Sequence, residues 1–185
     1  RGNPILALLE HYCGVDWRNL PFDGRSFAPE GSAQLEWFAL PLSSAAPPYS
    51  PHRNAPAAGD NIGLTVIDPD SGGRVFYAPG LAEISSSVRA QMEAADCVLV
   101  DGTFWTDDEM IQLGISSKRG CDIGHLAQSG SGGMIEHLGR LPARTRRILI
   151  HINNTNPILD ENSRERAILD AAGIEVAFDG MEINL

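Results

Sequence analysis

The sequence is poor in cysteine and in basic residues, and it contains no long uninterrupted apolar run. Acidic residues outnumber basic ones by 24 to 14, which gives a net charge of −10. Such a chain has no general electrostatic attraction for a phosphate backbone, so we expect no nucleic-acid partner. No apolar run approaches the ~20 residues that a membrane-spanning helix needs, so we expect no membrane span.

The three cysteines, at positions 13, 97 and 121, are odd in number and widely spaced. This pattern predicts neither a disulfide framework nor a CxxC metal site. A reducing compartment follows, and we expect a cytoplasmic protein. Cys97 lies within the apolar run CVLV and is expected to be part of the core.

The chain has no initiating methionine and opens on RGNPILALLEHY, which reads as a loop leading into a helix. We also find no secretory signal peptide. We interpret the chain either as processed or as the C-terminal part of a longer protein. Its 185 residues, of which 43% are hydrophobic, suit one domain that buries a core.

Apolar periodicity and turn residues predict an α/β chain with a mixed sheet. From residue 83 onward, helical and strand patterns alternate, which favours helices packed on the faces of a layered sheet. The proline-rich loop 43–61 is long enough to be functional or mobile. We expect helices at 4–13, 83–95, 132–141 and 162–172, strands at 33–42, 96–102, 146–151 and from 174, and a hairpin over 62–80.

Two of the predicted strands end in polar residues that can carry chemistry. Asp101 follows the apolar run 98–100, and His151 follows the apolar run 148–150. If these strands are parallel neighbours, both side chains lie in one crevice, where they can share a divalent metal or act as acid and base. Equally, Asp101 can close a turn with the two residues after it, while His151 bonds within the core. The spacing alone leaves both interpretations open.

A glycine-rich loop, 129–133, follows His125 and leads into a predicted helix. Such a loop presents free backbone N–H groups and can bind an anion. It lacks the GxxxxGK[ST] pattern and its lysine, so we do not expect a nucleotide phosphate loop. A flexible loop before a capped helix explains the glycines at least as well.

The other polar residues are less specific. His52 lies on the proline-rich loop, where it either faces a substrate or is solvated. The acidic run 107–109 is typical of a helix N-terminus, which the helix dipole favours. Neither a GxSxG elbow nor an HExxH metal motif is present.

Several long strings of the sequence are distinctive: VLVDGTFWTDDEM, GHLAQSGSGGMIEHL, ILIHINNTNPILDENS and the ending GIEVAFDGMEI. They resemble the coenzyme PQQ synthesis protein B family, which is itself similar to the metallo-β-lactamase superfamily. The resemblance runs from RGNP to the last residue. It implies an αββα sandwich, in which two mixed sheets lie face to face with helices outside. The chain is then a single domain, residues 1–185, without its N-terminal half.

The resemblance implies a role in the biosynthesis of pyrroloquinoline quinone (PQQ), a redox cofactor built from a Glu and a Tyr of a precursor peptide. Family members have been proposed to carry iron and to hydroxylate the tyrosine ring of the Glu–Tyr-derived intermediate with oxygen. The alternative is a non-catalytic carrier that holds PQQ or its precursor, or helps move it to the periplasm. A generic metallohydrolase ranks third, because nothing in the sequence marks a scissile bond.

The family's functional positions can be carried over residue by residue. His151 matches the last metal-ligand histidine, and Asp101 and His125 match positions in the two loops before it. Asp101 is then a metal ligand or an acid that orients the ligands, and His125 contacts substrate or moves protons. The implied metal is divalent iron or zinc. We assign binding of the PQQ precursor to His52, Arg53, Ser129, Asn153 and Asn154.

This chain departs from the superfamily pattern in two ways. The bridging aspartate expected after one strand is replaced by Pro79-Gly80-Leu81, which argues against a symmetric two-metal site. The histidine-rich motif of the N-terminal half is missing from this chain. We therefore expect a metal that is weakly held or not bound at all. We also expect an exposed apolar sheet face that drives homodimerisation or aggregation, and no activity from this chain alone.

Overall fold

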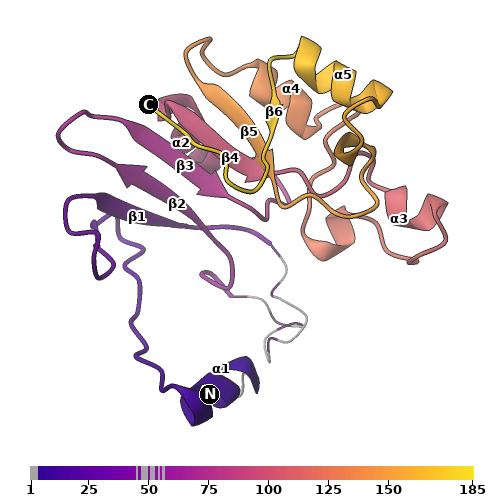
Figure 1. Ribbon diagram of the computed structural model, residues 1–185. Coiled ribbons are helices and arrows are strands. Elements are labelled where there is room, and N and C mark those ends of the chain that lie inside the picture. Colours follow the sequence, from indigo (N-terminus) through magenta and orange to yellow (C-terminus); the bar gives the residue numbers. More distant parts are fainter. Residues whose placement is uncertain (1–3, 45, 47–49, 51–52, 54, 56) are drawn as a thin grey trace.

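The computed structural model describes residues 4–44, 46, 50, 53, 55 and 57–185. Its centre is one six-stranded sheet whose strands follow one another in chain order (Figure 1). The first three strands are antiparallel neighbours, and each later strand is parallel to the one before it. The strands are β1 (Glu36–Pro41), β2 (Ile62–Ile67), β3 (Arg74–Ala78), β4 (Cys97–Asp101), β5 (Arg146–Ile150) and β6 (Glu175–Val176).

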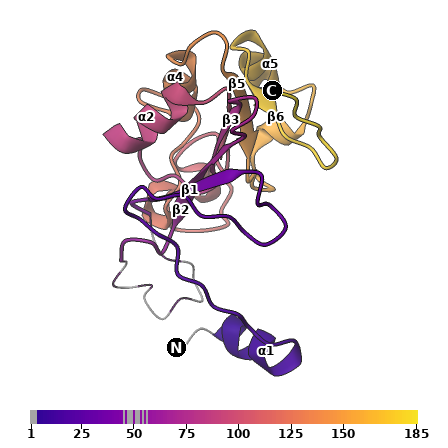
Figure 2. The same cartoon turned by 90° about the vertical axis from the view of Figure 1, so that its left-hand side faces the viewer.

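Helices cover one face of this sheet. The helices are α1 (Pro4–Tyr12), α2 (Ser86–Ala94), α3 (Glu109–Gln112), α4 (Met134–Gly139) and α5 (Arg164–Ala171), with short 3-10 turns η1 (Cys121–Ile123) and η2 (Pro157–Leu159). Apolar side chains of α2, α4 and α5 form one buried cluster with alternate residues of β3 to β6. Figure 2 shows α2 and α4 on one side of the sheet and the segment after β6 on the other. This layering confirms the predicted mixed sheet with helices packed on it.

The local signals that predicted the elements also explain where they begin and turn. In the β2–β3 hairpin, the Asp68 carboxylate accepts hydrogen bonds from the Asp70 N–H and the Ser71 hydroxyl, which closes the predicted turn. Ser85 caps α2 by accepting from the Val88 N–H, so the helix begins at Ser86 and not at residue 83 as expected. The helical pattern that was expected to end at Gly173 does so, and this glycine has the left-handed φ of 65° that favours it there.

The opposite face of the sheet is less covered. Side chains such as Val75 and Leu99 are partly exposed, and Tyr77 is 40% exposed. The segment after β6 crosses this side and ends near the β2–β3 turn (Figure 1). The described residues thus form one mixed sheet, whereas the resemblance implied two, because no described strands lie across from this face.

Helix α1 forms where the sequence predicted it, but it buries none of its residues. It stands apart from the sheet in both views, so its apolar side chains contribute nothing to the core cluster (Figures 1 and 2). Among the described residues, no helix has the length and apolar character needed to cross a membrane.

The core position of Cys97 gives a direct test of the fold. Its side chain has no exposed surface, and burial raises the pKa of its thiol to about 11. Since the thiolate is the reactive form, iodoacetamide at pH 8 should alkylate the exposed Cys13 first. Cys121 should react more slowly, because its hydrogen bond to Asp107 raises the pKa of its thiol. Mass spectrometry should find Cys97 modified only in denaturant; rapid native labelling of Cys97 would contradict this core.

Candidate metal and acid–base site

The C-terminal ends of β4 and β5 lie side by side, as the sequence predicted. The two strands are parallel, and Asp101 is paired with Ile150, so His151 follows directly at the same edge of the sheet. The closest approach between the Asp101 carboxylate and the His151 ring is 4.0 Å, from Oδ1 to Nδ1. The two strand ends therefore meet as expected, and we call the region where they meet the crevice.

Asp101 is the most constrained side chain of the crevice, because it has no exposed surface. Its Oδ2 accepts hydrogen bonds from the Leu81 N–H (2.8 Å) and from Nδ1 of His125 (2.7 Å). Its Oδ1 accepts from the N–H (3.0 Å) and the hydroxyl (2.5 Å) of Thr103. These donors fill the roughly four acceptor positions of a carboxylate and offset the cost of burying it. Asp101 therefore both closes a turn and contacts the candidate site, so the two interpretations of its sequence position are compatible.

The hydrogen bonds around Asp101 also fix which nitrogen of His125 carries a proton. A carboxylate oxygen can only accept, so Nδ1 of His125 must donate to it. The lone pair of a neutral imidazole then lies on Nε2. His125 is held in place by its backbone N–H, which donates to Gly120, and its side chain is 16% exposed.

The hydrogen bonds of Thr103 likewise fix which nitrogen of His151 carries a proton. The Thr103 hydroxyl has one proton, and the nearest acceptor is the Asp101 carboxylate, which makes the stronger, charge-assisted bond. Its oxygen is then free to accept from Nδ1 of His151, 2.9 Å away. His151 thereby also presents Nε2 as its free nitrogen. The two imidazole rings are stacked, with centroids 5.2 Å apart and planes at 29°.

His151 adopts an unusual backbone conformation. Its φ of 57° makes it the single non-glycine residue with positive φ among the residues that the structure describes. Histidine visits this left-handed region more readily than most residues, at a cost of roughly 1 kcal/mol or more. The turn aims the side chain back toward Thr103, although that side chain remains 54% exposed.

The loop that follows His151 is tied to the loop that follows Asp101. The Asn153 N–H donates to the Thr103 carbonyl (3.1 Å). The Asn156 amide, 2% exposed, donates to the carbonyls of Gly102 (3.0 Å) and Thr103 (3.2 Å). Its own oxygen accepts from the Ile158 N–H, which caps η2. One buried amide thus joins both loops of the crevice.

Most of the residues to which the sequence assigned substrate binding have described surroundings. Arg53 donates to the Ala46 carbonyl (2.5 Å), and the Ser129 hydroxyl donates to the Trp105 carbonyl (2.7 Å). Asn153 bonds Thr155, and Asn154 is exposed. His52 lies outside the described residues. Their role in binding stays a prediction.

Three residues with clear positions in the site were not singled out from the sequence. Thr103 joins Asp101 to both histidines, and Asn156 joins the two loops. Glu109 begins a helix, as its acidic run predicted, but the sequence did not indicate that it would be buried. The sequence carries a local signal only for Asn156, which precedes Pro157 at the start of η2.

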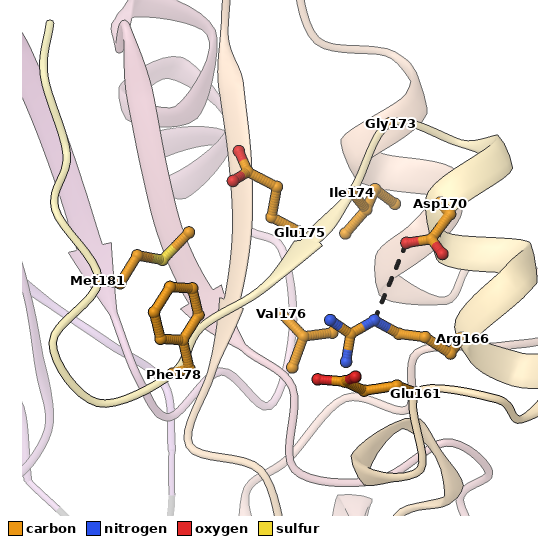
Figure 3. Close-up of a pocket in the computed structure, with 9 residues that line it drawn as sticks. All are labelled: Glu161, Arg166, Asp170, Gly173, Ile174, Glu175, Val176, Phe178 and Met181. Carbon is orange, nitrogen blue, oxygen red and sulfur yellow. Dashed lines mark ion pairs between the residues drawn. The ribbon is translucent and has the colours of Figure 1, made fainter.

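Cavities lie on more than one side of the sheet. One, of ≈520 Å³, has among its lining residues Leu42, Ser44, Cys121 and Gly124, the last of which precedes His125 in the sequence. Another, of ≈440 Å³, lies along β6 and α5 (Figure 3). Its lining combines Arg166 and Asp170, which form an ion pair at 3.8 Å, with Phe178 and Met181. Of these two cavities, the first is lined by a residue next to His125 in the sequence, and the second is not.

The crevice has the chemistry of a divalent metal site. One ligand atom from each of Asp101, His125 and His151 lies within 4.8 Å of the others, and imidazole and carboxylate donors suit zinc or iron. The two imidazoles fit this role best, because their Nε2 atoms have no partner in the network around Asp101. Asp101 fits better as the acceptor that orients the imidazoles, since its oxygens are already occupied.

Comparisons with known proteins agree with this architecture. A family model described as "Beta-lactamase superfamily domain" matches residues 1–152. The chain belongs to this superfamily. Across its full length it is also 60% identical, over 184 residues, to coenzyme PQQ synthesis protein B of Azoarcus sp. strain BH72. It is 59% identical over 182 residues to the protein of that name from Cupriavidus necator. The chain spans 60% and 59% of the lengths of these two relatives.

Solved structures show the same fold. The structure described as Zn²⁺-bound PqqB from Methylobacterium extorquens matches with a TM-score of 0.82 and 30% identity, over 98% of this chain and 62% of that one. The metallo-β-lactamase fold protein YhfI of Bacillus subtilis matches with a TM-score of 0.59 at 12% identity, over 96% of this chain and 59% of that one. The second likeness concerns the fold alone. The metallo-β-lactamase fold expected from the sequence is thus confirmed.

The close approach of the two strand ends leaves no room for a side chain at Gly102. A Cβ there would lie 2.6 Å from Ile152 Cδ1 and 2.9 Å from Leu149 Cβ. We expect Gly102→Ala to lower the free energy of unfolding by about 2 kcal/mol, because such overpacking forces the strand ends apart. Urea denaturation measures this change.

Gly139 provides the matched control. It lies in α4, and a Cβ there would meet nothing within 4 Å. Gly139→Ala should be neutral or stabilising by up to about 1 kcal/mol, since alanine favours helix. Equal stabilities of the two variants would show that the strand ends are not packed as described.

Proposed function

We propose that this chain contributes to a metal-dependent enzyme of PQQ biosynthesis that oxidises or hydroxylates a Glu–Tyr-derived precursor. The observation that carries the proposal is the network of Asp101, in which one buried carboxylate orients two stacked histidines. The similarity to coenzyme PQQ synthesis protein B supports the pathway, and the Zn²⁺-bound neighbour supports a divalent metal.

In this proposal, Nε2 of His125 and Nε2 of His151 hold a divalent metal. When bound, iron would supply the oxygen chemistry that ring hydroxylation needs, whereas zinc would supply Lewis-acid chemistry only. Asp101 keeps both imidazoles in the tautomer that leaves Nε2 free, directly for His125 and through Thr103 for His151. If His125 is instead left free of the metal, the same hydrogen bond to Asp101 lets it hold or return a proton at Nε2.

The number of metal ligands explains why we expect this chain to bind its metal weakly. Catalytic zinc sites commonly use three protein ligands, and two imidazoles offer fewer. Because the chain spans 60% of the length of its Azoarcus relative, we propose that the remaining ligands lie in the additional residues of such proteins. The partly exposed apolar sheet face, with Leu99 and Tyr77, would drive the homodimerisation proposed for this chain alone.

The substrate would occupy the cavity that Gly124 lines. Its ≈520 Å³ suits a small molecule of the size of a Glu–Tyr-derived intermediate. A precursor rich in carboxylates needs cations, and Arg53 is the described arginine on the long loop that reaches this side of the sheet. Arg53 is therefore the residue that we propose to contact the precursor.

Metal titration tests the proposal. Zinc and ferrous iron are offered separately to the purified chain, and affinity is measured by calorimetry. We expect His151→Gly to abolish metal binding, because it removes the imidazole. Glycine is chosen because it tolerates the positive φ of that position, so the backbone is not strained. Asp101→Asn should weaken binding about 10- to 100-fold, the usual effect of losing the group that orients a ligand histidine. His11→Ala, on the exposed side of α1, is the control and should bind as the unmodified chain does.

The outcomes separate the proposed enzyme from a carrier. Metal binding that is unchanged in His151→Gly would refute the assignment of the site. Binding of PQQ that persists after chelation of all metal would favour a carrier, because an enzyme of this kind needs its metal to act. Metal-dependent conversion of the precursor by the full-length protein would favour the enzyme.

A further inference from the structure

We infer that Glu109 is a positioning residue that holds the loop of His151 in place. The inference rests on the proposed function in so far as His151 binds metal. Glu109 is the first residue of α3 and lies far from His151 in the sequence. Although it is an acidic residue, it is only 6% exposed. A carboxylate buried to this degree needs partners, and those of Glu109 lie on either side of the crevice.

The two oxygens of Glu109 join two separate segments. Oε2 accepts a hydrogen bond from the Trp105 N–H (2.7 Å), within the loop that follows Asp101. Oε1 accepts from the Thr155 hydroxyl, within the loop that follows His151. Glu109 is therefore a bridge between the two loops that build the candidate site.

The bridge continues from Thr155 toward His151. The Asn153 side-chain amide donates to the Thr155 hydroxyl oxygen, and the Asn153 backbone N–H donates to the Thr103 carbonyl. These contacts end two residues from His151. They hold the backbone segment that must keep the positive φ of that histidine.

His151 needs this support because its own side chain is weakly held. Its side chain is 54% exposed, its ring makes one hydrogen bond, to the Thr103 hydroxyl, and it otherwise lies 4.0 Å from the Asp101 carboxylate and stacks on the ring of His125. Its direction is therefore set by the loop backbone. Asn156 secures the far end of the loop, and Glu109 secures its middle through Thr155.

Favourable interaction with a helix dipole does not explain Glu109. Helix α3 has only four residues, so its dipole is small. The neighbouring Asp108 precedes the same helix and makes an exposed bond to Gln112, as an ordinary surface acid does. Glu109 differs because one oxygen is bonded within its own loop, to the Trp105 N–H, while the other is bonded to Thr155 in the loop that follows His151.

The test compares four single variants and the double variant Glu109→Ala/Thr155→Val, all measured first without metal. Glu109→Ala removes the bridge, Thr155→Val removes only its far end, and Glu109→Gln keeps a side chain of the same length that can still bond both segments. Glu165→Ala is the matched control, since Glu165 also lies in the first turn of a helix. Hydrogen exchange reports the protection of the Asn153 and Asn156 amides, with the amides of β4 as the internal reference.

We expect Glu109→Ala and Thr155→Val to exchange at Asn153 at least about 10-fold faster, while β4 is unchanged. Glu109→Gln should exchange nearly as the unmodified chain does. The double variant should be no worse than Glu109→Ala, because both changes cut the same connection. Zinc affinity should fall in the same order, by about 10-fold for Glu109→Ala.

Exchange at Asn153 that is as slow in Glu109→Ala as in Glu165→Ala would overturn the inference. So would Glu109→Gln behaving as Glu109→Ala, since the bridge depends on hydrogen bonds and not on charge. If Glu109→Ala does not fold, Thr155→Val decides by itself, because it removes a single hydroxyl. If the unmodified chain binds no zinc, the two imidazoles do not hold a metal without further ligands, and the exchange data still decide the role of Glu109.

Discussion

The buried carboxylate of Asp101 is the constraint on which the site depends. A carboxylate with no exposed surface is stable only when hydrogen bonds replace its lost water, and four donors do so here. These donors come from three separate segments: the loop after β3, the turn after β4, and the loop that carries His125. Satisfying one side chain therefore brings the segments of the crevice together.

The parallel sheet makes this arrangement possible, and the loops refine it. Parallel pairing of β4 with β5 places the ends of both strands at one edge, where Gly102 permits their close approach. The Thr103 hydroxyl bonds both the Asp101 carboxylate and His151. Asn156 and Glu109 hold the loop that follows His151. The sheet thus determines which residues meet, and the buried polar groups determine how their side chains are oriented. This division suits a site whose chemistry requires two imidazoles to face one point.

The sequence predicted the parts of the site that depend on strand order. Asp101 and His151 could be paired because each follows an apolar run, and parallel neighbours end together. His125 follows no strand, so only the family resemblance pointed to it. Thr103 and Glu109 could not be found, since their importance depends on which distant atoms the folded loops bring within hydrogen-bond reach. The second sheet implied by the resemblance has no counterpart among the described residues, because all the described strands pair into one sheet.

The central claim is that Asp101 orients both histidines so that Nε2 is free, and the tautomers of His125 and His151 test it most directly. Two-dimensional NMR that correlates ring nitrogens with ring protons in the ¹⁵N-labelled chain, recorded without metal at a pH where both rings are neutral, reports which nitrogen is protonated. We predict protonated Nδ1 in both rings, and conversion of His125 to the mixed tautomers of a free imidazole in Asp101→Asn. A proton on Nε2 of either ring in the unmodified chain would contradict the account, because that nitrogen would then have no lone pair for a metal.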